Sequence, residues 1–168
     1  MRNILYFHGL ESFLSDKKKN ILEKFGTVTA NRYKYRIPEV LSGIIETFDD
    51  NQSDNTVLIG SSFGGYVAHM LSVGYNIPCL LFNPALVYRS IDESLDITID
   101  QEKVNYSYIV LGRKDEVINC DANLQFINTH IKESKKVIIE ENMQHGIPVD
   151  VFEKHVQLFL KKLEQNDA

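Results

Sequence analysis

A serine between glycines, in the stretch Thr56 to Ala68, is the first candidate for chemistry in this chain. The stretch reads TVLIGSSFGGYVA: an apolar run ends at Gly60, and Ser62 stands in the pattern G-x-S-x-G before a helix-compatible run. At a sharp turn from strand to helix, a serine is held in a strained conformation and its hydroxyl projects clear of the sheet. Gly60 and Gly64 supply the room for such a turn. The pattern predicts a nucleophile at Ser62, although a glycine-rich turn without chemistry has the same five letters.

A candidate acid and a candidate base follow two later strand-like runs. Asp115 comes in the loop after Tyr106 to Leu111, and His145 comes in the loop after Lys136 to Glu140. Sites in parallel sheets lie at the carboxyl ends of the strands, so both side chains are expected to meet Ser62 there. The order Ser, Asp, His also accompanies this kind of serine turn. In these roles His145 takes the proton of Ser62, and Asp115 orients the imidazole through its other nitrogen.

Other acids and histidines compete for the two roles. Glu116 lies beside Asp115, but the gap from Gly112 suits a short loop that presents Asp115. Asp121 and Asp150 are further acids, and neither follows a strand. The other histidines fall on helices or too close to the first strand for the expected order, and His8 is expected to brace its loop; they are His8, His69, His130 and His155.

Two backbone N–H groups are needed to stabilise the oxyanion that forms when a carbonyl is attacked. One is expected from Phe63, the residue after the serine, because it opens the helix. The second normally comes from the loop after a neighbouring strand, and the segment YFHGLES is the candidate loop. We assign this second donor to the N–H of Leu10, with His8 and Gly9 shaping the turn.

Strand-like and helix-like runs alternate along the chain, which indicates an α/β fold. Near-continuous apolar strands are typical of a mostly parallel sheet, here of about six strands, with helices on both faces and right-handed crossovers. The expected strands are Asn3 to Phe7, Thr27 to Tyr33, Thr56 to Gly60, Ile77 to Phe82, Tyr106 to Leu111 and Lys136 to Glu140. The expected helices run from Ser15 to about Lys24, Pro38 to Asp49, Phe63 to Val73, Val117 to Thr129 and Val149 to Leu163, with a short one near Ala85 to Ser90.

Length and composition set the broad class. The 168 residues suit one domain, residues 1–168, with a sizeable core. The net charge of −5 argues against nucleic acid as a partner, and no run reaches membrane-spanning length. Cys79 and Cys120 have neither disulfide-framework nor zinc-site spacing, so we expect a cytoplasmic protein with no metal and no cofactor.

Four segments carry a resemblance to a known family. The sequences YFHGLESF, GSSFGGYVA, NPAL and LGRKDEV, in that order, resemble those of the YqiA-type esterases of bacteria, which are small α/β-hydrolases. The likeness runs over most of the chain. It implies a compact α/β-hydrolase fold and the triad Ser62, Asp115 and His145, the same residues that strand position indicates.

The expected reaction is the hydrolysis of a small carboxylic ester through an acyl-enzyme on Ser62. The segment between the strands that end near Phe82 and Leu111 is too short for a helical cap domain, so we expect an open or shallow site. Short acyl esters are the first expectation. Candidate lining residues are Phe13, Tyr66, Leu86, Val87 and Val117.

Two other functions stay open. A thioesterase would use the same chemistry, but no basic cluster in the sequence converges on the site to hold a phosphate or a coenzyme A tail. A non-catalytic ligand- or protein-binding domain could share the fold, since a fold does not imply a function. The presence of all three triad residues weighs against this binding domain. The sequence leaves the oligomeric state open.

Overall fold

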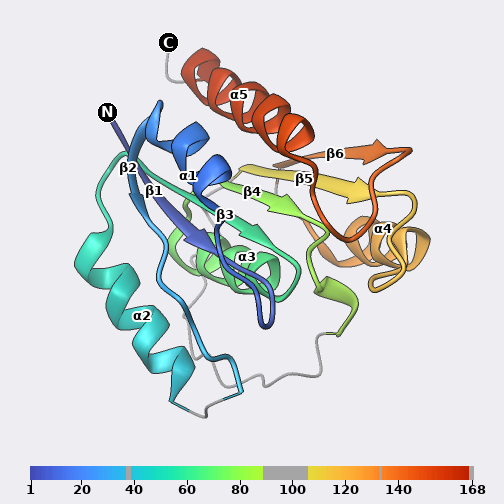
Figure 1. Ribbon diagram of the computed structural model, residues 1–168, viewed down its shortest axis with the longest axis horizontal. Helices are drawn as coiled ribbons and strands as arrows, with labels where there is room; N and C mark the ends of the chain where they lie inside the picture. The colour runs from blue at the N-terminus through green and yellow to red at the C-terminus, as the bar shows by residue number, and fades with distance from the viewer. Residues whose placement is uncertain (37–38, 89–105, 133, 167–168) are drawn as a thin grey trace.

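The computed structural model describes residues 1–36, 39–88, 106–132 and 134–166. Within them, one sheet contains six strands that are all paired in parallel, in the order β2-β1-β3-β4-β5-β6 (Figure 1). The strands are β1 (Arg2–Phe7), β2 (Gly26–Thr29), β3 (Thr56–Ser61), β4 (Cys79–Phe82), β5 (Tyr106–Gly112) and β6 (Ser134–Glu140). The helices are α1 (Asp16–Glu23), α2 (Val40–Asn51), α3 (Phe63–Tyr75), α4 (Cys120–His130) and α5 (Val149–Asn166), with a 3₁₀ turn η1 (Leu86–Tyr88).

The strand order places a change of direction between β1 and β3. The chain first moves outward from β1 to β2, and then returns past β1 to continue through β3, β4, β5 and β6. Right-handed crossovers in opposite directions put their helices on opposite faces of the sheet. Ligands of such sheets bind at the carboxyl ends of the strands, at the point where the order reverses. The loops after β1 and β3 therefore border the expected site.

Helices cover both faces of the sheet, as expected. One face packs against α1 and α5, where Leu22, Phe152 and Phe159 are fully buried, and the other packs against α2, α3 and α4. Residues of β3 from Thr56 to Gly60 are buried throughout, because each face of this central strand meets a core. This explains the uninterrupted apolar runs that predicted the parallel sheet.

The expected elements are confirmed in type and order. Several of their ends differ by a few residues, and three of these differences have local reasons. β2 ends at Thr29 rather than at Tyr33, whose N–H instead donates to the ring of His8. α3 passes through Gly74 and ends at Tyr75, and its C-cap Asn76 takes the left-handed conformation that asparagine tolerates. α4 begins three residues after Val117, because the side chain of Asn119 caps it.

Parts of two expectations lie outside the described residues. The start of the second helix at Pro38 is one, and α2 is described from Val40. The other is the connection from β4 to β5, where a cap domain would be inserted. Its described part contains the single turn η1 and no cap domain, and residues 89–105 lie outside the described part.

Candidate active site

Ser62 lies between the end of β3 and the first residue of α3. Its backbone angles are φ 55° and ψ −123°, a left-handed region that is strained for a residue with a side chain. Two backbone hydrogen bonds stabilise this strained conformation. The N–H of Ser62 donates to the Phe82 carbonyl (3.0 Å), and the Ser62 carbonyl accepts from the N–H of Ala85 (2.9 Å). This is the geometry expected of a serine presented at a strand-to-helix turn.

Gly60 and Gly64 allow three backbone segments to meet beneath Ser62. A Cβ atom on Gly64 would lie 2.2 Å from the Phe7 carbonyl oxygen and 2.3 Å from that of His8. A Cβ atom on Gly60 would lie 2.3 Å from the Gly64 carbonyl oxygen. The end of β1 is therefore pressed against the turn, as the two glycines predicted.

The structure brings Ser62, His145 and Asp115 together from three loops. Nε2 of His145 is 3.1 Å from Oγ of Ser62, and Nδ1 of His145 is 2.8 Å from Oδ2 and 3.1 Å from Oδ1 of Asp115. Since an ionised carboxylate can only accept, Nδ1 carries the proton and Nε2 accepts from the Ser62 hydroxyl. The side chain of His145 is 29% exposed, so a substrate can reach this end of the array.

Asp115 is fixed more firmly than a surface acid. Its side chain is 1% exposed, and Oδ1 also accepts from the backbone N–H groups of Val117 (2.8 Å) and Ile118 (2.9 Å). These bonds take up one oxygen and aim the other at His145.

The two expected oxyanion donors belong to the start of α3 and to the loop after β1. Phe63 is the first residue of α3, so its N–H has no acceptor within the helix. Leu10 follows Gly9, and a Cβ atom on Gly9 would lie 3.1 Å from Cβ and 3.6 Å from Oγ of Ser62. The loop after β1 thus lies directly against Ser62.

His8 braces this loop through both ring nitrogens. Its Nε2 accepts from the N–H of Tyr33 (2.8 Å), so Nδ1 carries the proton and donates to the Gly9 carbonyl (2.6 Å). A trans peptide points its C=O and N–H in opposite directions. By holding the Gly9 carbonyl, His8 therefore sets the direction of the Leu10 N–H.

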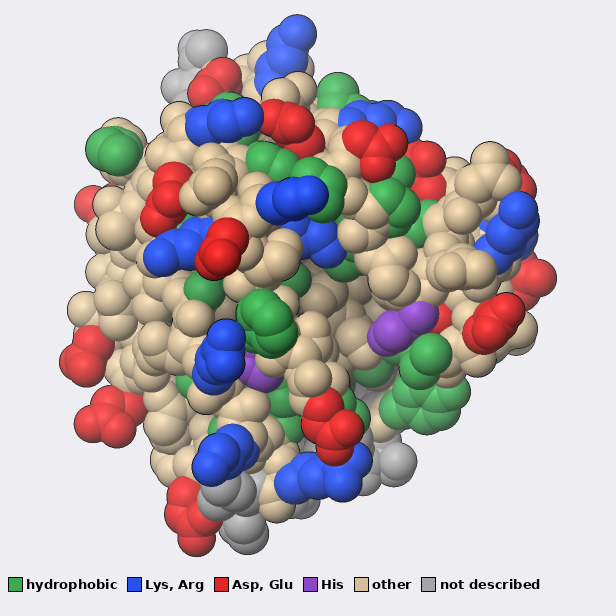
Figure 2. Space-filling view, viewed as in Figure 1, with side chains coloured by type: hydrophobic (Ala, Val, Ile, Leu, Met, Phe, Trp, Pro, Cys, Tyr) green, Lys and Arg blue, Asp and Glu red, His purple; other side chains and the backbone are tan. Residues whose placement is uncertain are grey.

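Apolar side chains stand at the rim of the site. Leu10, Phe13, Tyr88 and Val117 are about half exposed and belong to the segments that follow strands at the carboxyl edge of the sheet. On the face shown in Figure 2, histidine (purple) borders a hollow, and Lys, Arg, Asp and Glu are interspersed around it. Two of the expected lining residues are core residues instead, namely Tyr66 and Leu86, because α3 and η1 turn them toward the cluster beneath the site.

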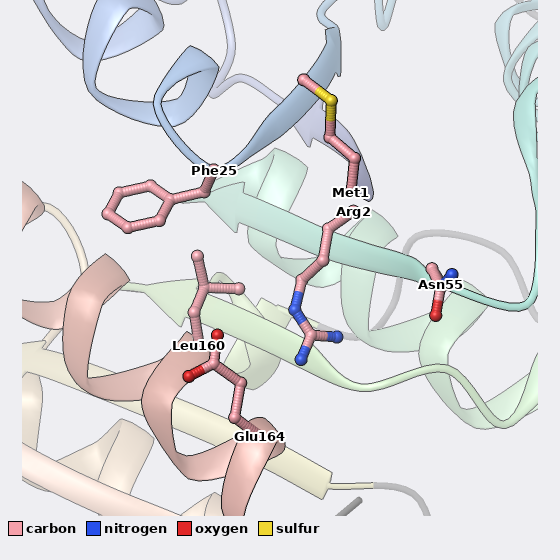
Figure 3. A pocket seen from close by; sticks show the side chains of 6 residues that line it. All are labelled: Met1, Arg2, Phe25, Asn55, Leu160 and Glu164. Carbon is pink, nitrogen blue, oxygen red and sulfur yellow. The ribbon is translucent and has the colours of Figure 1, made fainter.

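Two cavities among the described residues lie at opposite ends of the sheet. One, of about 220 Å³, is lined by Tyr6, His8 and Phe13 and adjoins the loop after β1. The other, of about 280 Å³, lies at the amino ends of β1 and β3, where the side chains of Arg2 and Glu164 extend into it (Figure 3). Of these two, the first is the one whose lining includes residues of the loop after β1.

Sequence reasoning missed Asn83, which contacts the loops of both His145 and Asp115. Its side chain is buried and hydrogen-bonds to Gly112, Gln144 and His145. Its position offered a signal, because it directly follows a buried strand at the same edge of the sheet as the other site residues.

A second buried histidine, His155, belongs to α5, the helix that follows the loop of His145. His155 is fully buried, its Nε2–H donates to Glu140 (2.7 Å), and its Nδ1 accepts from the hydroxyl of Tyr108 (3.0 Å). Burial holds the pKa of His155 below its ordinary value of 6.5, although the hydrogen bond with Glu140 opposes this. Glu140 ends β6, immediately before the loop that carries His145, and it also accepts from Lys154 (2.6 Å).

This arrangement predicts a loss of stability in mild acid. As pH falls below 6.5, the unfolded chain takes up a proton at His155 before the folded protein does, so the free energy of unfolding decreases. The slope is at most about 1.4 kcal/mol per pH unit for one group. Besides Tyr108, the groups that face His155 are Glu140, Lys154 and Lys136, and Glu140 titrates in a lower window because Lys154 and His155 hold its pKa down.

Urea unfolding between about pH 7 and pH 5 measures this effect. Glutamine carries no charge at any pH, so in His155→Gln the free energy of unfolding should change less with pH than in the wild type. His130→Gln, at an exposed histidine, should show the same pH dependence as the wild type. An equal slope in His155→Gln and the wild type would contradict the prediction.

Among residues 1–36, 39–88, 106–132 and 134–166, no three His, Cys, Asp or Glu side chains form a group that could hold a metal ion. Cys79 and Cys120 are buried, and neither forms a disulfide. No helix in the described part of the chain has the length and apolar character needed to cross a membrane.

Solved structures share this architecture. Est1E from Butyrivibrio proteoclasticus, with ferulic acid bound, matches 100% of this chain and 90% of its own, with a TM-score of 0.72 and 16% identity. The Bacillus cereus carboxylesterase matches 95% of this chain and 88% of its own, with a TM-score of 0.68 and 17% identity. A predicted CIB-like hydrolase from Thermoplasma acidophilum matches 98% of this chain and 86% of its own, with a TM-score of 0.66 and 23% identity. At these identities the likeness establishes the α/β-hydrolase fold.

Sequence comparison adds a family. The model of the Uncharacterised protein family (UPF0227) matches residues 3–108. No curated protein matches the chain. The fold expected from the family resemblance is thus confirmed, and the YqiA-type esterase assignment stays a prediction.

Proposed function

This chain belongs to the Uncharacterised protein family (UPF0227) and has the α/β-hydrolase fold, and on that premise we propose that it is a serine hydrolase that cleaves carboxylic esters through an acyl-enzyme on Ser62. The observation that carries the proposal is the continuous array from Ser62 Oγ through His145 to Asp115, at 3.1 and 2.8 Å. A serine hydroxyl is a weak nucleophile until an adjacent base takes its proton, and this array supplies the base and its orienting acid.

In the first half-reaction, Oγ of Ser62 attacks the ester carbonyl while Nε2 of His145 takes the hydroxyl proton. Asp115 stabilises the imidazolium that forms. When the tetrahedral intermediate collapses, the carbon–oxygen bond to the alcohol breaks, and His145 returns the proton to the leaving oxygen. Water then attacks the acyl-enzyme with His145 again as base, which releases the carboxylic acid and restores Ser62.

The oxyanion of both intermediates needs donors that are already in place. We assign these to the N–H groups of Phe63 and Leu10. The start of α3 supports the first, because helix N-termini favour negative charge. The hydrogen bond from His8 to the Gly9 carbonyl supports the second, since it orients the peptide that bears the Leu10 N–H.

The apolar side chains at the rim of the site suggest which esters the protein accepts. Phe13 and Val117 are 55% and 59% exposed beside the site, so they can cover an apolar acyl or alcohol group. Est1E, whose fold is similar, has been solved with ferulic acid bound, an aromatic acid. We therefore propose small esters with an apolar or aromatic part as substrates.

Labelling with a fluorophosphonate probe tests the proposal directly. The wild type should form a covalent adduct that peptide mapping places on Ser62, and neither Ser62→Ala nor His145→Ala should label at the wild-type rate. Ser72→Ala is a matched control, because it removes a buried hydroxyl that donates to the Ile77 carbonyl within the same helix region. A folded wild type that does not label would favour the non-catalytic binding domain.

A thioesterase is the second candidate, and one structural observation favours it. Lys19 and Arg32 both line the cavity of about 220 Å³ beside the loop after β1, together with the single acid Asp16. The sequence alone indicated no basic cluster at the site, and these two residues are separated along the chain. Comparing hydrolysis of acyl-coenzyme A thioesters with that of p-nitrophenyl esters of the same chain length distinguishes the two activities.

A further inference from the structure

The segment Phe82 to Ala85, which follows β4, holds Ser62 by its backbone. The carbonyl of Phe82 accepts from the N–H of Ser62, and the N–H of Ala85 donates to the carbonyl of Ser62. Pro84 lies against the first turn of α3, where a Cβ atom on Gly65 would be 2.9 Å from it. The strained turn is therefore fastened on both sides by one short stretch of chain.

The side chain of Asn83, in the middle of this stretch, reaches the two other loops. Its Oδ1 accepts from the N–H of Gly112 (2.6 Å), three residues before Asp115. Its Nδ2 donates to the carbonyls of Gln144 (2.9 Å) and of His145 itself (3.2 Å). One amide thus joins the loop of the acid to the loop of the base.

Asn83 has little freedom to move. It is 2% exposed, and its backbone has φ 43°, a left-handed conformation that Asn, Asp and Gly adopt more readily than other residues. Its N–H donates to the Val110 carbonyl (2.9 Å). The next carbonyl, that of Pro84, accepts from the buried side chain of Asn123 (2.8 Å). The residue is held on both sides, so its amide has a defined position.

Only an amide satisfies these three partners. It offers one acceptor to an N–H group and two donors to two carbonyls. A carboxylate of the same size would place an oxygen against the carbonyls of Gln144 and His145, and an apolar side chain would leave buried polar groups unpaired. The loop of the base passes close to the loop of the acid, because a Cβ atom on Gly112 would lie 2.5 Å from the Met143 carbonyl oxygen.

We propose that Asn83 is a positioning residue that sets His145 and Asp115 at their distances from each other and from Ser62. The inference rests on the proposed function for its catalytic consequence. The geometric part, that Asn83 maintains the His145–Asp115 hydrogen bond, stands independently of any reaction.

Two variants and two measurements test it. Asn83→Gly removes the side chain and tolerates the left-handed backbone, and Asn83→Asp keeps the volume and also favours that backbone. The first measurement is fluorophosphonate labelling of Ser62 at several probe concentrations, which separates the maximal rate from probe binding. The second is the downfield ¹H NMR signal of the His145 Nδ1 proton shared with Asp115, assigned by its loss in His145→Ala. Ser72→Ala serves as the control for lost stability.

We expect the maximal labelling rate to fall on the order of 10²-fold in both variants with probe binding unchanged, because a shift of about 1 Å at a reacting group has that effect. The downfield signal should also be lost in both and kept in Ser72→Ala. Folded Asn83→Gly or Asn83→Asp with the wild-type rate and signal would overturn the inference. If the wild type itself does not label, the proposed function fails, and the NMR signal alone decides the role of Asn83.

Discussion

Asp115→Asn should fold like the wild type and lose about 10⁴-fold in kcat. The reason lies in the two oxygens of Asp115. Oδ1 accepts from the N–H groups of Val117 and Ile118, so an asparagine keeps its carbonyl oxygen there and turns its NH₂ toward His145. Nδ1 of His145 must then accept, which leaves the proton on Nε2, facing Ser62. In this tautomer the imidazole cannot take the serine proton.

The measurement is steady-state hydrolysis of a p-nitrophenyl ester, with thermal unfolding to verify the fold. Asp121→Asn is the matched control, because Asp121 is 80% exposed on α4 and pairs with Arg113 away from His145. It should retain wild-type activity. If Asp115→Asn kept full activity, Asp115 would have no role in setting the histidine tautomer, and the proposed mechanism would be wrong.

Gly64→Ala should destabilise the fold by at least about 3 kcal/mol and abolish labelling of Ser62. The added Cβ would lie 2.2 and 2.3 Å from the carbonyl oxygens of Phe7 and His8, and backbone atoms cannot move aside as a flexible side chain can. Either α3 or the end of β1 must shift, and both position Ser62. Urea unfolding gives the change in free energy, and the probe reports on the site.

Gly43→Ala is the matched substitution, since Gly43 lies in α2 and a Cβ atom there would have nothing within 4 Å. It should stabilise the protein by about 0.5–1 kcal/mol, because alanine loses less conformational freedom in a helix than glycine does. Equal stability of Gly64→Ala and the wild type would show that the turn can relax, contrary to the close contacts beneath Ser62.

Much of the fold was predictable because its signals are local. The apolar runs of β3, β4 and β5 mark strands buried on both faces, and a parallel sheet gathers their carboxyl ends at one edge. Ser62, Asp115 and His145 each follow a strand, so their meeting could be predicted from chain order alone. Gly60 and Gly64 were likewise recognisable by their spacing from the serine.

Other features depend on residues that are distant in the chain. β2 ends early because the Tyr33 N–H pairs with the ring of His8, which lies 25 residues earlier in the chain. This partner cannot be identified from a local pattern. Tyr66 has the composition of a lining residue, and only the packing of α3 on the sheet makes it a core residue.

The sequence by itself determined the order of elements, the sheet edge at which the site lies and the identity of the three residues that meet there. Tertiary structure decided how they are held: the tautomer of His8, the aim of the Asp115 carboxylate and the reach of Asn83 from β4 to the loops after β5 and β6. The physical reason is that strand and turn signals act over a few residues. Hydrogen bonds between loops depend instead on distances that exist only once the sheet has formed.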